Sequence, residues 1–124
     1  STRFYRLLRT RLAPGAAVSV QCTSPLYARQ AYWCIVRTME AAGFTVRPYQ
    51  TTVPSFGVWG FALARQGPFE VPKRVSVPVR FLDDATLAAM FLFPRDMTPV
   101  PVEINRLDNQ MLVRYYEEEW RHWS

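Results

Sequence analysis

The chain has 124 residues, of which 49% are hydrophobic and 15% aromatic, which is enough for one domain with a core and too few for two. No stretch approaches the roughly 18–20 uninterrupted apolar residues of a membrane span, and no apolar segment of a signal peptide follows the basic start. The net charge of +5 is unevenly distributed. Positions 1–80 hold eleven basic and two acidic residues, whereas positions 81–124 hold four basic and eight acidic residues.

This charge asymmetry predicts that a basic surface meets an acidic one, within the chain or across a dimer. The arginines near the start are interpreted as a solvated helix face, so no nucleic acid is expected as a partner. Two cysteines and one histidine argue against a metal site and a histidine-based catalytic triad. Both cysteines lie in apolar segments, where reduced thiols are common, so we expect a cytoplasmic location.

Apolar residues at helical spacing predict a first helix over residues 4–12. Residues 16–22 predict a buried strand, because apolar residues dominate both of its faces, as in parallel sheets. Ser24 as N-cap and Pro25 at the first helical position predict the start of a second helix. Gly43 is placed to end that helix in a left-handed cap.

Two further strands are predicted over residues 44–53 and 59–65. The strand–helix–strand order from residue 16 to residue 53 implies a right-handed crossover and a parallel strand pair. The strand over 59–65 returns antiparallel after a turn. The fold class is therefore α/β, with residues 1–66 as its sheet-bearing part and residues 67–124 as a C-terminal extension packed on it, in a single structural domain.

In that extension, alternating valines at residues 75–79 predict a short edge strand or an extended segment. Asp83 or Asp84 is expected to cap a third helix, and Asp108 a last one. The last helix is predicted to carry four apolar side chains on one face, namely Leu112, Tyr116, Trp120 and Trp123. Its acidic run at 117–119 opposes the helix dipole, so we expect a basic partner from the first half.

The run VPSFGVWGF at residues 53–61 predicts a hairpin turn that carries two large aromatic residues, Phe56 and Trp59. One interpretation is that these rings cover the edge of the core. The other is that they form a binding loop that presents aromatic faces to a ligand. The local pattern leaves both interpretations open.

Topology brings this turn close to the end of the first strand. Ligands of parallel α/β sheets bind beyond the carboxyl ends of the strands. Gln21 stands at one such end, and Ser55, Phe56 and Trp59 follow the other. We therefore expect these four residues to form one cluster, whose aromatic faces suit a cation or an alkyl chain. The alternatives are that Gln21 satisfies backbone groups of the next loop and that Trp59 packs in the core.

The chemistry that the chain lacks is also informative. No glycine-rich strand-to-helix turn is present to bind a nucleotide or a sulfonium cofactor. No acidic pair stands at either strand end, so no general base is expected there. The sequence thus predicts no catalytic, cofactor-binding or metal-binding residue in this chain.

Several collinear stretches, taken together, resemble the C-terminal part of polyamine aminopropyltransferases, the spermidine synthase-like family. The resemblance is greatest to a bacterial branch whose catalytic domain often follows membrane spans, and the run at residues 53–61 is specific to that branch. The matching stretches are residues 4–8, 12–15, 20–25, 31–35, 40–44, 53–57, 59–64, 105–109 and 115–116.

The resemblance implies a Rossmann-like, methyltransferase-type fold, of which this chain would be the C-terminal half. It implies transfer of an aminopropyl group from decarboxylated S-adenosylmethionine to an amine such as putrescine. Gln21 and Phe56 match positions that line the amine side of the pocket. Val58 stands where the branch usually has an acid, so a dicationic substrate would lack a nearby negative charge there.

The family's cofactor loop and catalytic acids lie before the position that matches Ser1. We therefore expect a fragment that is inactive alone, from a parent enzyme that could be membrane-anchored with this part on the cytoplasmic side. The strand over 16–22 would be an apolar edge, which predicts self-association, for example as a homodimer. The alternatives are a non-catalytic assembly module with a decayed site and a methyltransferase-fold enzyme acting on another amine.

Overall fold

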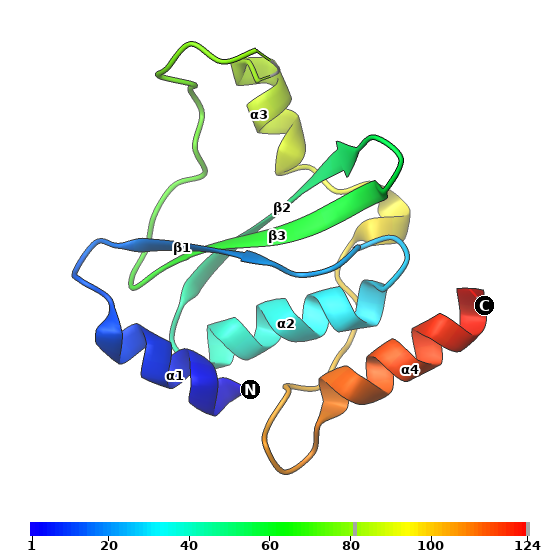
Figure 1. Ribbon diagram of the computed structural model, residues 1–124. Coiled ribbons are helices and arrows are strands. Elements are labelled where there is room, and N and C mark those ends of the chain that lie inside the picture. Colours follow the sequence, from blue (N-terminus) through cyan, green and yellow to red (C-terminus); the bar gives the residue numbers. More distant parts are fainter. Residues whose placement is uncertain (81, 124) are drawn as a thin grey trace.

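The structure, a computed structural model, describes residues 1–80 and 82–123, except for the side chain of Trp123. It is an α/β fold with a three-stranded antiparallel sheet and four α-helices (Figure 1). The elements in chain order are α1 (Thr2–Arg11), β1 (Ala17–Gln21), α2 (Arg29–Ala41), β2 (Thr45–Val53), β3 (Gly57–Arg65), α3 (Asp84–Met90), a 3-10 turn (Arg95–Met97) and α4 (Met111–Trp123).

The strand order of the sheet is β1-β3-β2, and β3 is antiparallel to both of its neighbours. Val20 of β1 lies opposite Ala62, and Val46 of β2 lies opposite Ala64. β1 and β2 thus run in the same direction, as predicted, but the prediction that they pair with each other is wrong. The hairpin strand β3 lies between them and forms a ladder with each.

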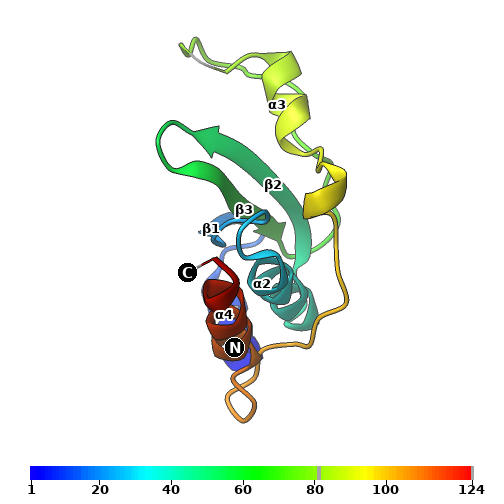
Figure 2. The same ribbon diagram turned by 90° about the vertical axis from the view of Figure 1, so that its right-hand side faces the viewer.

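The prediction that β1 is buried on both faces is also wrong. β1 alternates between exposed and half-buried residues, because it is an outer strand of the described sheet and only one of its faces packs on the helices. The helices α1, α2 and α4 lie on that side of the sheet, and α3 lies away from them, next to β2 (Figures 1 and 2).

The start of α2 differs from the prediction by about one turn. Ser24 Oγ does accept hydrogen bonds from the backbone N–H groups of Leu26 and Tyr27, at 3.3 and 3.2 Å. It caps a separate turn, however, and the continuous helix begins at Arg29. The other end is as predicted: Gly43 has φ of 101°, and Phe44 N–H donates to Met39 O, which closes a left-handed cap.

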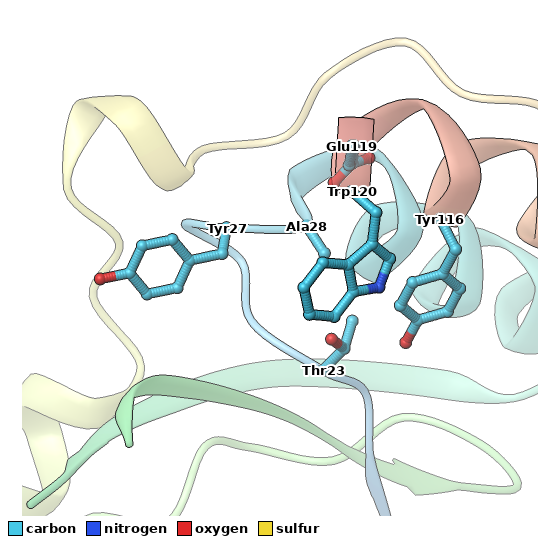
Figure 3. A pocket seen from close by; sticks show the side chains of 6 residues that line it. All are labelled: Thr23, Tyr27, Ala28, Tyr116, Glu119 and Trp120. Atoms are coloured by element: carbon cyan, nitrogen blue, oxygen red, sulfur yellow. The ribbon is translucent and has the colours of Figure 1, made fainter. Parts of the chain in front are cut away.

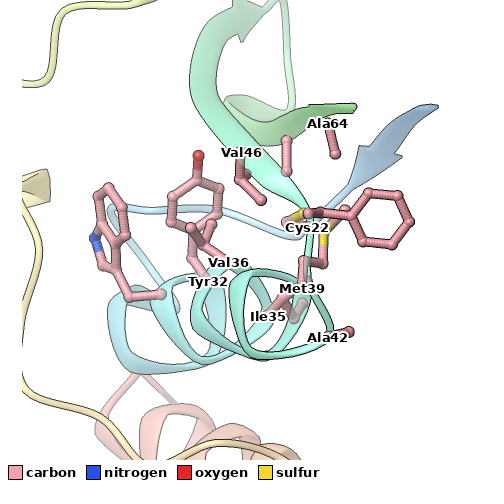
Figure 4. Close-up of a cluster of buried hydrophobic side chains, with 11 residues drawn as sticks. Cys22, Tyr32, Ile35, Val36, Met39, Ala42, Val46 and Ala64 are labelled. Carbon is pink, nitrogen blue, oxygen red and sulfur yellow. The ribbon is translucent and has the colours of Figure 1, made fainter. Parts of the chain in front are cut away.

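The core lies between α2 and the inner face of the sheet (Figure 4). Eleven buried residues form its main cluster, and six of them come from α2 or its C-cap. Tyr32 is fully buried, and its hydroxyl donates to Phe61 O at 2.9 Å. The members are Cys22, Tyr32, Trp33, Ile35, Val36, Met39, Ala42, Phe44, Val46, Ala62 and Ala64.

Two possibilities were predicted for residues 75–79, an edge strand or an extended segment. The edge strand is wrong, because no strand forms among the described residues between β3 and α3. Pro72 and Pro78 remove backbone donors from that segment, and Val75 N–H donates to Asp84 Oδ1 at 2.9 Å instead of to a ladder. The predicted cap of α3 is confirmed, since Asp83 Oδ1 accepts from Thr86 N–H at 2.7 Å.

The start of α4 is set by another residue than the one predicted, whereas its predicted apolar face is confirmed in part, since Leu112 and Tyr116 are half-buried and pack against the core clusters. Asn109 Oδ1 accepts from Met111 N–H at 3.2 Å, so the expectation that Asp108 caps this helix is wrong. Tyr115 is buried, with its hydroxyl accepting from Glu103 N–H at 3.0 Å, whereas Trp120 is 68% exposed. The predicted place of Trp123 lies outside the described side chains.

Both cysteines are free and buried, as expected. Burial raises the pKa of Cys22 to about 12 and also raises the pKa of Cys34. We therefore expect neither thiol to react with a maleimide at neutral pH in the folded protein, and both to react after unfolding in urea. Rapid labelling of the folded protein would contradict this burial.

The raised pKa of Cys22 also predicts how stability depends on pH. Because the unfolded Cys22 thiol ionises at lower pH than the folded one, the free energy of unfolding should fall as the pH rises toward 12.

Candidate functional site

Three of the four predicted site residues lie together at one end of the sheet. Gln21, Phe56 and Trp59 line one hollow with a volume of about 510 Å³, which we call the hairpin groove. The turn after β1 and helix α4 complete its wall. The lining residues are Gln21, Thr23, Ser24, Phe56, Trp59, Tyr116 and Trp120.

The hairpin presents its two aromatic rings rather than burying them. Phe56 is 70% exposed, and Trp59 is half-buried. Their ring centroids are 6.3 Å apart in an edge-to-face arrangement, and Trp59 Nε1–H donates to Phe56 O at 3.3 Å. The interpretation of Trp59 as a core residue is therefore wrong, because this hydrogen bond holds the indole over the turn and beside the groove.

Ser55 is not among the residues that line the hairpin groove. It lies in the turn with φ of 69°, a left-handed conformation, and it is exposed. Its backbone therefore shapes the turn that presents Phe56. Gln21 lies at the end of β1 opposite Phe61, and within the described part of the chain its side chain makes no hydrogen bond to the next loop.

The turn after β1 is held to β3 by backbone hydrogen bonds. Cys22 N–H donates to Gly60 O at 2.8 Å, and Gly60 N–H donates to Thr23 O at 2.6 Å. Thr23 adopts a left-handed conformation with φ of 67°. This pairing fixes the distance between the end of β1 and the aromatic hairpin, which are separated by more than thirty positions in the chain.

Helix α4 contributes a second hollow that the sequence analysis did not predict. We call it the α4 pocket. Its volume is about 300 Å³, and it is lined by Thr23, Tyr27, Ala28, Tyr116, Glu119 and Trp120. In the view of Figure 3 the Trp120 indole lies between the rings of Tyr27 and Tyr116. The i, i+3, i+4 spacing of positions 116, 119 and 120 was the available signal, since it places them on one helix face.

Glu119 is the acidic residue of this pocket. Its Oε1 accepts from Ala31 N–H at 3.0 Å, at the start of α2, and its Oε2 is buried without a hydrogen-bond partner. Desolvation raises the pKa of the Glu119 carboxyl, and the negative charge of Glu118 acts in the same direction, while the backbone N–H groups at the start of α2 oppose them. A basic side chain was expected to compensate the acidic run at 117–119. For Glu119, the positive N-terminal end of the α2 dipole takes this role instead.

Two ion pairs with known geometry lie within the basic half of the chain. Arg37 pairs with Glu40 at 2.7 Å and Lys73 with Glu70 at 3.8 Å, so each pair lies within residues 1–80. No group of three or more potential metal ligands occurs among the described residues. None of the described helices is long and apolar enough to cross a membrane.

No protein-family model matches the chain. Among curated proteins it is 48% identical over 120 residues to a polyamine aminopropyltransferase of Leptospira interrogans, and 49% identical over 122 residues to polyamine aminopropyltransferase 2 of Ralstonia nicotianae. The polyamine aminopropyltransferase of Mycobacterium tuberculosis is 39% identical over 123 residues.

Each of these alignments covers 97% of this chain and 24% of the relative, so the chain spans about a quarter of the length of the proteins it matches. The resemblance noted in the sequence is confirmed by this identity. The chain is therefore homologous, over nearly its whole length, to one part of the polyamine aminopropyltransferases.

Proposed function

We propose that this chain forms part of the amine-binding pocket of a spermidine synthase-like aminopropyltransferase. Gln21 supplies an amide that hydrogen-bonds to the amine, and the Phe56 and Trp59 rings contact its alkyl chain and cationic end. Ser55 acts only through the shape of the turn. The single observation that carries the proposal is that Gln21, Phe56 and Trp59 line one groove in a chain homologous to these enzymes.

We infer a Rossmann-like, methyltransferase-type fold for the catalytic domain of the complete enzyme. Two mutually parallel strands with a helical crossover on one face support this inference. Decarboxylated S-adenosylmethionine is the proposed aminopropyl donor, bound by other parts of the enzyme. Free buried thiols fit a reducing compartment, so we place the reaction in the cytoplasm.

We propose further that the chain by itself does not catalyse the transfer. The attacking amine must lose a proton, and the residues that line the hairpin groove include no carboxylate and no imidazole. A base from another part of the enzyme would take that proton, and the sulfonium would leave as a neutral thioether. Aminopropyl transfer to putrescine by the isolated chain would refute this part of the proposal.

The test of the pocket is the Phe56→Ala variant of the complete enzyme. We expect the KM for putrescine to rise about tenfold, because an aromatic contact to an ammonium or its alkyl chain contributes roughly 0.5–2 kcal/mol. The KM for the aminopropyl donor should stay unchanged. Phe4→Ala, which removes another exposed phenylalanine on α1, is the matched control. An unchanged KM for putrescine in Phe56→Ala would contradict the assignment.

The same assay separates the two alternatives. An assembly module with a decayed site would show no turnover with any amine. A related enzyme with another acceptor would prefer an amine of lower charge than putrescine, and Val58 in place of an acid is the feature that favours such a preference.

We also propose that the chain self-associates through β1. Its outer edge has no strand partner within the described residues, and such edges pair readily with other chains. Ala17→Lys adds a charge to this exposed edge, and Ala85→Lys makes the same change at an exposed site on α3. In sedimentation velocity at micromolar concentration, wild type and Ala85→Lys should be dimers and Ala17→Lys a monomer. A monomeric wild type would disprove this arrangement.

A further inference from the structure

The hairpin groove and the α4 pocket are parts of one continuous concave surface. Both are lined by Thr23, Tyr116 and Trp120. The surface begins at the hairpin with Phe56, passes the turn after β1 and ends beside Glu119 at the start of α2. It therefore offers room for a ligand longer than one amine group.

The two ends of this surface carry different chemistry. The hairpin end offers aromatic rings and the amide of Gln21, without a charged lining residue. The α4 pocket offers the rings of Tyr116 and Trp120 together with the carboxylate of Glu119. Aromatic faces next to a carboxylate form the combination that recognises organic ammonium groups.

The state of the Glu119 carboxylate favours a cationic occupant. Oε1 accepts from Ala31 N–H, and Oε2 is shielded from water, so the carboxylate acts on an occupant of the pocket through its charge rather than through a direct hydrogen bond. An ammonium group in the pocket is attracted by this charge. An anion would be repelled by both Glu119 and the neighbouring Glu118, the negative charge of which already acts on Glu119.

The exposure of Trp120 points to the same conclusion. Its side chain is 68% exposed, although α4 is anchored to α2 on its other face by the buried Tyr115. A bound alkylammonium would cover part of this indole and gain both apolar contact and a cation–π interaction. Arg29, a cation at the start of α2, is directed away from the pocket, since it donates to Thr98 O and Arg95 O.

We propose that the α4 pocket binds one ammonium end of a linear polyamine, with Glu119 as its counter-charge and Tyr116 and Trp120 as its aromatic walls, while the rest of the molecule lies in the hairpin groove. This inference rests on the proposed function, because it assigns the second end of the same amine ligand. It makes α4 a part of the binding surface that discriminates between amines with one and with two charges.

The experiment compares putrescine with n-butylamine by isothermal titration calorimetry on the intact protein. Glu119→Gln removes the charge but keeps an oxygen that can accept from Ala31 N–H, so the fold should be retained. Glu117→Gln makes the same charge change on the exposed face of α4 and is the matched control. We expect Glu119→Gln to weaken putrescine binding about tenfold, because it removes an opposite charge close to the ammonium group, and to leave n-butylamine binding within about twofold.

A second measurement locates the ligand. In ¹H–¹⁵N spectra, putrescine should shift the indole signal of Trp120, assigned with Trp120→Phe, and n-butylamine should shift that of Trp59 more than that of Trp120. Equal putrescine affinity in Glu119→Gln and Glu117→Gln would overturn the inference, as would an unmoved Trp120 signal at saturation.

The same variants separate this inference from the proposed function. Loss of putrescine binding in Phe56→Ala with no effect of Glu119→Gln would leave the proposed function standing and refute the α4 pocket. An effect of Glu119→Gln with none of Phe56→Ala would support an ammonium site in the α4 pocket and refute the role of the hairpin groove. Failure of the intact protein to bind putrescine at millimolar concentration would refute both.

Discussion

Gly60→Ala is expected to reduce the free energy of unfolding by about 3 kcal/mol, at the upper end of what overpacking costs. A Cβ at position 60 would lie 2.6 Å from Cδ2 of Tyr32 and 2.9 Å from Cδ of Pro25. Neither neighbour can move easily, because Tyr32 is fully buried and hydrogen-bonded to Phe61 O, and the pyrrolidine ring is rigid. Urea unfolding followed by circular dichroism measures the loss.

The control for this prediction is a double-mutant cycle with Tyr32→Leu. Removing the ring relieves most of the clash, so Gly60→Ala should cost less in the Tyr32→Leu background than in the wild type. Equal costs in both backgrounds would show that the close approach of Gly60 to Tyr32 is not the cause. Because Gly60 also donates to Thr23 O, the clash should separate β3 from the turn after β1 and weaken amine binding in the hairpin groove.

Thr38→Val should cost about 2 kcal/mol of unfolding free energy, mainly because it leaves a buried backbone donor without an acceptor. Thr38 is 1% exposed, and its hydroxyl donates to Cys34 O at 2.6 Å and accepts from Asn105 N–H at 2.9 Å. Asn105 in turn accepts from Thr2 N–H through its carbonyl oxygen and from Leu112 N–H through its side chain. This one hydroxyl therefore links α2 to the ends of both α1 and α4.

The matched control is Thr38→Ser, which keeps the hydroxyl and should cost less than Thr38→Val. Thermal unfolding of the three proteins gives the comparison. Thr38→Val should also lower putrescine affinity, since loss of the Asn105 bond loosens the start of α4 and with it the walls made by Tyr116 and Trp120. If serine and valine were equally destabilising, the loss would come from packing and the hydrogen bond would be unimportant.

The local chemistry of short segments made some features predictable from the sequence. Gly43 had to end α2, because only glycine adopts a left-handed conformation there without strain. A cap of α3 by Asp83 or Asp84 was predictable, because both side chains precede a run of helix-forming residues, and the structure selects Asp83. The two aromatic residues of the hairpin turn could be recognised as candidates, because a short connection offers them no core of its own.

Other features depended on competition between distant segments. No residue near positions 16–22 indicates that β1 pairs with β3 rather than with β2. The failure of residues 75–79 to form a strand follows from their prolines and from the carboxylate of Asp84, which offers Val75 N–H a nearer acceptor. The capping of α4 by Asn109 in place of Asp108 is a choice between adjacent side chains that only the loop geometry makes.

The sequence by itself determined the helices, the hairpin and the aromatic pair at positions 56 and 59, because these depend on spacing, capping and turn chemistry within a few residues. It also nominated Gln21, through the rule that ligands meet strand ends. Only the tertiary structure brought α4 to this edge and left Glu119 with one oxygen unpartnered. The contact between Glu119 and Ala31 joins residues almost ninety positions apart and depends on how α4 packs against α2. No local sequence pattern encodes which face of a distant helix closes a pocket.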